Sequence, residues 1–111
     1  MKPVFYSPNA NRDVAAAILY YEEEAGAVVA SGFVDALEEI IDRIATWPAS
    51  GSPYFGELLS LPGLRSWKIQ RFPYIVFTME RPDRVNVWRV LHERRDIPST
   101  LQSSLEEYLD W

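Results

Sequence analysis

Side chains able to carry phosphate or proton chemistry are concentrated in one stretch of this sequence, residues 64–96. The stretch holds eight of the 11 arginine and lysine residues and the only histidine. Such cations can stabilise the charge of a pentacovalent phosphate, and a histidine or carboxylate can exchange protons with it. The candidates for a centre of this kind are Arg65, Lys68, Arg71, Arg89 and His92.

A predicted strand near the end of this stretch separates two of the candidates. Its alternation places Arg89 on one face and His92, together with Trp88 and Val90, on the other. Two roles for His92 stay open: an acid–base pair with the neighbouring Glu93, or a strand-end histidine bonded to backbone.

Other kinds of site find little support in the sequence. With one histidine, no cysteine and no short loop rich in aspartate, the sequence favours no metal centre. Gly51, Gly56 and Gly63 lack the spacing of a loop that cradles phosphate. We therefore expect neither a metal nor a cofactor.

Length and composition predict one small domain. The chain has 111 residues, of which 48% are hydrophobic, so it can build a real core. The absence of cysteine fits a reducing compartment, and the sequence contains no secretion signal or membrane-length apolar run. We expect a cytoplasmic protein with no membrane partner.

The net charge of −5 conceals a segregation of charge along the chain. Residues 64–95 carry eight basic residues against three acidic ones, whereas residues 1–63 carry three against nine. The last 16 residues add four acids and no base. Two interpretations stay open: the basic segment steers an anionic partner, or its arginines pair internally with helical carboxylates.

Caps and apolar spacing predict a strand and then two helices. Residues 3–6 form a short apolar strand, and Ser7 with Pro8 is typical of a helix start. Gly26 ends the first helix, and a second helix follows over residues 27–46. Each helix has one apolar stripe, so the pair must cover a sheet.

The rest of the chain predicts a meander and a last helix. After a loop at residues 49–63, strands are expected at residues 64–70, 74–80 and 85–91. Ser99 or Thr100 would cap a final helix, whose stripe either packs on the domain or waits for a partner. That stripe consists of Leu101, Leu105, Tyr108 and Leu109.

The stretches RFPYIVFTME and VLHERRDIP, within this order of elements, resemble the RelE/ParE superfamily of bacterial toxins. These are the toxins of type II toxin–antitoxin modules, which stabilise plasmids. The resemblance covers about residues 2–98 and implies an α+β fold. Its order is β-α-α-β-β-β(-α), with a mainly antiparallel four-stranded sheet covered on one face by a helical hairpin. We expect a toxin domain at residues 1–98 and a helical extension of it at residues 99–111.

The resemblance implies two functions of different classes. RelE-like toxins are ribosome-dependent mRNA endoribonucleases, for which the five candidates above would serve. ParE-like toxins inhibit DNA gyrase without catalysis of their own. The pI of about 4.8 and the acidic tail favour the ParE-like branch, because phosphate contacts dominate the affinity for RNA. A third possibility is an inactive or differently targeted member that only binds an antitoxin.

The resemblance also implies a cognate antitoxin that folds onto the toxin, and no sequence-specific DNA binding by the toxin alone. The groove beside the two helices and an exposed sheet face are the expected docking places. The candidate contact residues are Val14, Ile18, Tyr21, Phe33, Arg71, Arg89 and Arg95.

Overall fold

The computed structural model describes residues 1–110, so Trp111, the predicted end of the last helix, lies outside the described residues. The α+β prediction is confirmed: a four-stranded sheet has the order β1-β4-β3-β2. The strands are β1 (Val4–Tyr6), β2 (Leu64–Lys68), β3 (Tyr74–Glu80) and β4 (Val85–His92). Strand β1 runs parallel to β4, and the other two pairings are antiparallel.

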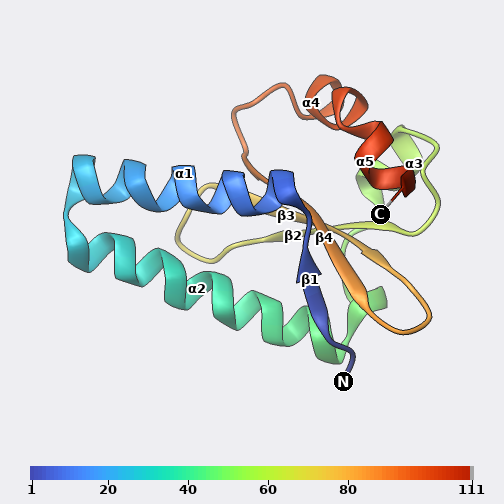
Figure 1. Ribbon diagram of the computed structural model, residues 1–111, viewed down its shortest axis with the longest axis horizontal. Helices are drawn as coiled ribbons and strands as arrows, with labels where there is room; N and C mark the ends of the chain where they lie inside the picture. Colours follow the sequence, from blue (N-terminus) through green and yellow to red (C-terminus); the bar gives the residue numbers. More distant parts are fainter. Residues whose placement is uncertain (111) are drawn as a thin grey trace.

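Two long antiparallel helices, α1 (Pro8–Ala25) and α2 (Ala27–Thr46), lie against one face of this sheet (Figure 1). The Ser7 side chain caps α1 by accepting from the Ala10 N–H at 3.0 Å, and it donates to the Trp88 carbonyl of β4. Gly26 joins the helices with a φ of 93°, a conformation that glycine adopts without steric cost. The hairpin is therefore fixed to β4 at its start and closed by one glycine.

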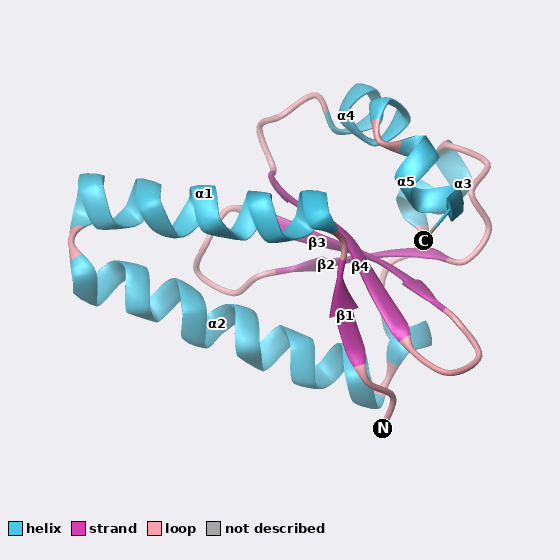
Figure 2. Cartoon of the chain, in the orientation of Figure 1, coloured by secondary structure: helices cyan, strands magenta, loops and turns pink. Residues whose placement is uncertain are grey.

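Short helices cover the other face of the sheet (Figure 2). They are α3 (Tyr54–Leu58), α4 (Ile97–Ser103) and α5 (Leu105–Asp110); a 3-10 turn, η1 (Pro48–Ser50), follows α2. Ile97, Leu101 and Tyr108 pack with Phe77 and Trp88 in a second apolar core. The expectation of an exposed sheet face was wrong, because the C-terminal stripe packs on the domain.

The final helix begins and breaks at residues that the sequence did not indicate. Its cap is Asp96, which accepts from the Ser99 N–H at 3.2 Å, so the predicted caps at Ser99 and Thr100 were wrong. The helix is interrupted at Ser104, whose carbonyl accepts from the Trp88 indole at 3.1 Å. We call α4 and α5 together, residues 97–110, the C-terminal strap.

A β-bulge changes the faces of β4. Phe77 pairs with Arg89 and Thr78 pairs with Val87, so Trp88 has no partner opposite it on β3. Trp88 consequently packs in the second core, while Val90 packs under the hairpin. The prediction that these two side chains share a face was wrong.

Within residues 1–110, none of the helices combines the length and apolar character needed to cross a membrane.

Candidate functional site

Arg89 is held inside the protein by an ion pair. Its Nε and Nη2 donate to the two carboxylate oxygens of Asp13 at 2.8 and 2.9 Å, and Asp13 also accepts from the Val90 N–H at 3.0 Å. A further guanidinium N–H donates to the Ser104 hydroxyl. The hydrogen bond to Asp13 raises the pKa of Arg89, although burial alone would lower it. Only 9% of Arg89 is exposed, so it is not free to contact RNA or an antitoxin.

The other candidates for phosphate chemistry do not converge. Arg65 shares the hairpin face of β2 with the buried Trp67, whereas Lys68 shares the opposite face with Leu64. Arg71 lies beyond the strand, in the turn that leads to β3. The five predicted side chains are therefore distributed over two faces, a turn and the interior.

His92 ends β4 as a histidine bonded to backbone. Its Nδ1 accepts from the Arg94 N–H at 3.1 Å, and its ring lies edge-on to Tyr74 with a centroid distance of 5.2 Å. The neighbouring Glu93 is exposed, and its backbone N–H donates to the Pro73 carbonyl. Of the two roles left open for His92, the geometry matches a strand-end histidine bonded to backbone.

Aromatic rings fill the space between the hairpin and the turn that joins β2 to β3. Tyr21 lies 5.2 Å from Phe72 and 6.1 Å from Tyr74, measured between ring centroids, and Phe33 contacts all three rings. Burial raises the pKa of Tyr21 and of Tyr74, so both hydroxyls stay neutral. We call this region, with the neighbouring Arg71 and His92, the turn-end surface.

The antitoxin candidates are distributed unevenly over this region. Phe33 has no exposed surface and belongs to the core, so it is unavailable to a partner in this structure. Val14, Ile18 and Tyr21 are half-buried against the hairpin core, whereas Arg71 and Arg95 are exposed.

Arg71 has an unusual backbone. Its φ is 71°, which costs an arginine about 1 to 2 kcal/mol relative to the ordinary helical region. It lines a cavity of about 290 Å³ between the turn and α2, together with Asp35, Glu39 and Phe72. A strained, exposed cation beside an aromatic cluster is a reasonable position for a binding residue.

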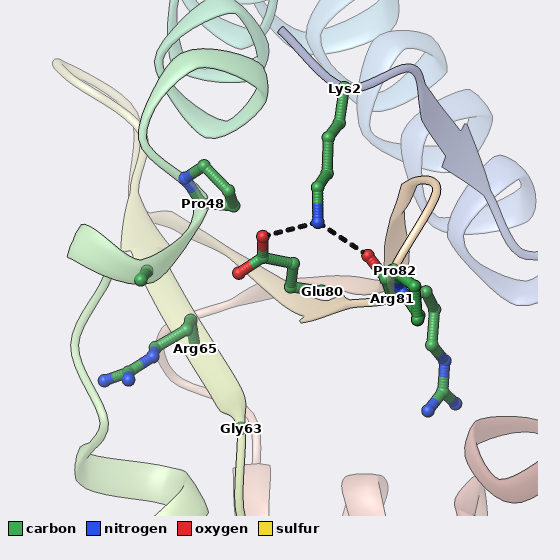
Figure 3. Close-up of a pocket in the computed structure, with 8 residues that line it drawn as sticks. Lys2, Pro48, Gly63, Arg65, Glu80, Arg81 and Pro82 are labelled. Carbon is green, nitrogen blue, oxygen red and sulfur yellow. Dashed lines mark hydrogen bonds and ion pairs between the residues drawn. The ribbon is translucent and has the colours of Figure 1, made fainter.

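A second concave surface lies at the opposite end of β3 (Figure 3). The Lys2 ammonium donates to the Glu80 carboxylate at 2.7 Å and to the Arg81 carbonyl at 2.8 Å. Arg65 extends from β2 away from Glu80. The cavity has a volume of about 370 Å³, and sequence reasoning assigned no role to it beyond naming Arg65.

Sequence reasoning also missed Asp13 and Ser104, which bind Arg89. A signal for Asp13 was present: it lies three residues after Ala10 and four before Ala17, both buried, so helical spacing places it on the inner face. Ser104 gave no such signal. Among residues 1–110, no three histidine, aspartate or glutamate side chains group as a metal site.

Comparisons with known proteins identify the family. The family described as "ParE toxin of type II toxin-antitoxin system, parDE" matches residues 4–97. A solved structure, "Chromosomal ParDE TA system from P. aeruginosa", superposes with a TM-score of 0.69 at 18% sequence identity. The match covers 83% of this chain and 96% of that chain, and at this identity it supports the fold alone. No curated protein matches the sequence. Because the family match spans most of the chain, the protein belongs to the ParE toxin family of type II toxin–antitoxin systems.

Proposed function

We propose that this toxin inhibits DNA gyrase in the cytoplasm by protein–protein contact and is neutralised by a cognate antitoxin. The proposal rests on the family and on the dispersion of the side chains that RNA cleavage would use. The observation that carries it is the Arg89–Asp13 ion pair, which withdraws the central cation of that set into the interior.

Electrostatics support a protein target. The whole chain has a charge of −5, and exposed acids such as Glu22, Glu23 and Glu24 lie along the hairpin. A protein that binds RNA must neutralise several phosphates, and this surface would oppose that approach. Docking onto a protein requires no such excess of basic charge.

The turn-end surface is our candidate for antitoxin contact. It combines half-buried aromatic side chains, among them Tyr21 and Tyr74, with the exposed cation Arg71. Ile18 precedes Tyr21 on α1, and the exposed Arg95 follows His92 after β4. An amphipathic antitoxin helix could lay its apolar side chains along α1 and place acidic residues near these arginines. We no longer include Phe33 and Arg89, because both are buried.

The test is induced expression without antitoxin, followed within minutes by separate labelling of DNA, RNA and protein synthesis. We expect DNA synthesis to fall first and cells to grow as filaments. Immediate loss of protein synthesis with DNA synthesis intact would favour the RelE-like alternative, to be examined with Arg71→Ala and His92→Ala. Growth indifferent to expression of the folded protein would favour a chain that only binds an antitoxin.

A further inference from the structure

Two adjoining cavities form one groove beside the β3–β4 turn. The cavity of Figure 3, about 370 Å³, shares Pro48, Ala49 and Glu80 with a second cavity of about 470 Å³ that Trp47 lines. Segments far apart in sequence supply its walls: the N-terminus, η1, β2 and the β3–β4 turn. We call this surface the Trp47 groove. It lies at the other end of β3 from the turn-end surface, which is a separation of roughly 20 Å along the strand.

The apolar wall of the groove is centred on an exposed tryptophan. Trp47 follows α2 and is 65% exposed, whereas Trp67 and Trp88 are buried. Its backbone N–H caps α2 by donating to the Arg43 carbonyl at 2.8 Å, which anchors the backbone of the residue. Pro48 and Ala49 continue the wall. A tryptophan held on a rigid turn offers a large area to a partner at little entropic cost.

The charged wall of the groove is basic. Lys2, Arg65 and Arg81 line it, and the one acidic residue among the described residues of its lining, Glu80, is paired with Lys2 at 2.7 Å. Within residues 1–110, Arg65 forms no ion pair or hydrogen bond through its side chain. Arg81 donates to the Tyr108 carbonyl at 3.2 Å, and its guanidinium forms no ion pair with a carboxylate of residues 1–110. The groove therefore presents an excess of positive charge on a chain whose net charge is negative.

The three cations do not meet at one point. The Lys2 ammonium lies over Glu80, while the Arg65 and Arg81 side chains extend away from it on different sides (Figure 3). A single small anion could not contact all three. An extended chain with several carboxylates, and one apolar side chain for Trp47, would match both walls.

We propose that the Trp47 groove binds an acidic peptide segment that carries a large apolar side chain. This inference rests on the proposed function: the antitoxin supplies the segment, and this contact is separate from the one at the turn-end surface. An extended strand needs about six residues to cover the roughly 20 Å between the two surfaces, so one antitoxin chain can occupy both. The carboxylates of the segment pair with Arg65 and Arg81, and its apolar side chain covers Trp47.

The probe is a fluorescein-labelled synthetic peptide of alternating glutamate and leucine, titrated against the full chain by fluorescence anisotropy. The matched control peptide has glutamine in place of glutamate. We expect saturable binding of the acidic peptide alone, weakened by salt because the charges are exposed. In a parallel titration with unlabelled peptide, tryptophan emission shifts to the blue as Trp47 is covered, and Trp47→Phe removes that shift.

Substitutions distinguish binding in the groove from nonspecific electrostatic attraction of the peptide to the protein. We expect Trp47→Ala to weaken binding about tenfold and Arg65→Gln about fivefold. Glu80→Gln should strengthen binding, about threefold, because it removes the one carboxylate among the described residues that line the groove. Arg12→Gln, with the same change of charge at an exposed position of α1, and Tyr20→Ala, an aromatic that is 55% exposed, should leave affinity unchanged.

Three results would overturn the proposal: no saturable binding at millimolar peptide, equal binding of the glutamine peptide, or equal losses in the groove and control variants. A variant that fails to fold would be recognised by its circular dichroism, and Glu80→Gln then still tests the proposal by the opposite sign. None of these measurements depends on toxicity, so a negative result for peptide binding in the groove would leave the proposed inhibition of gyrase standing. Conversely, a failure to inhibit gyrase would leave the peptide-binding result standing.

Discussion

Arg89 is the one charged residue among the buried residues of the described structure. Removing such a charge from water costs several kcal/mol unless its partners are well placed. Asp13 provides both carboxylate oxygens, and Ser104 provides a hydroxyl. One side chain thereby joins α1, β4 and the C-terminal strap, and its role is structural.

This role predicts strong coupling between Arg89 and Asp13. Asp13→Asn or Arg89→Met alone should lower the free energy of unfolding by about 3–5 kcal/mol, because each leaves a buried charge unpaired. The double variant Asp13→Asn/Arg89→Met should lose much less than the sum of the single losses. Urea unfolding of the four proteins measures this, and additive losses would show that the pair is not coupled.

A second prediction at this scale concerns alkaline pH. Burial raises the pKa of Tyr6 to about 12, and Glu38 adds to the effect. A folded pKa above the unfolded value of 10.0 means that stability is fully present below pH 10 and is lost as the pH rises toward 12.

We therefore expect the melting temperature to fall more steeply with pH in the wild type than in Tyr6→Phe. Burial also raises the pKa of Tyr108, so some dependence should remain in the variant. Thermal unfolding followed at several pH values checks the slopes, and identical slopes would contradict the burial of the Tyr6 hydroxyl.

The elements divide the core into two unequal layers. The hairpin covers one sheet face, and the C-terminal strap with α3 covers the other. The strap lies almost wholly beyond residues 4–97, the part that the ParE family match covers. The second core is therefore completed by a segment that lies mostly outside the matched residues.

The strap should contribute strongly to stability. Leu101 has no exposed surface, so Leu101→Ala should lower the free energy of unfolding by about 2–5 kcal/mol. Leu109, in the same predicted stripe, is 65% exposed, and Leu109→Ala should change the free energy of unfolding by less than about 0.5 kcal/mol. Denaturant unfolding compares the two, and equal effects would mean that the strap does not pack as described.

Element boundaries were predictable where a local chemical signal existed. Ser7 with Pro8 fixed the start of α1, and Gly26 separated the helices. The faces of β4 were not predictable, because nothing in its β-forming residues reveals that Trp88 is an extra residue in a bulge. The sequence did not decide whether the C-terminal helix covers the second sheet face, because its apolar stripe could equally pack in a core or bind a partner.

At the scale of the whole molecule, the candidate site was the least predictable feature. Charge counting located the basic segment, but it did not show that Arg89 pairs across 76 positions with Asp13, or that Arg65 and Lys68 lie on opposite faces. Long-range pairing decides which cations are free. The separation of the turn-end surface from the Trp47 groove also emerges only when the chain is folded.

The central claim is that this ParE-family toxin acts on gyrase without catalysing RNA cleavage. The most direct measurement adds the purified protein to gyrase, ATP and relaxed plasmid, and in parallel to a translating extract containing a reporter mRNA. We predict loss of supercoiling with accumulation of linear, gyrase-bound DNA, and an intact mRNA. Cleavage of the mRNA on ribosomes, with gyrase activity unchanged, would contradict the account.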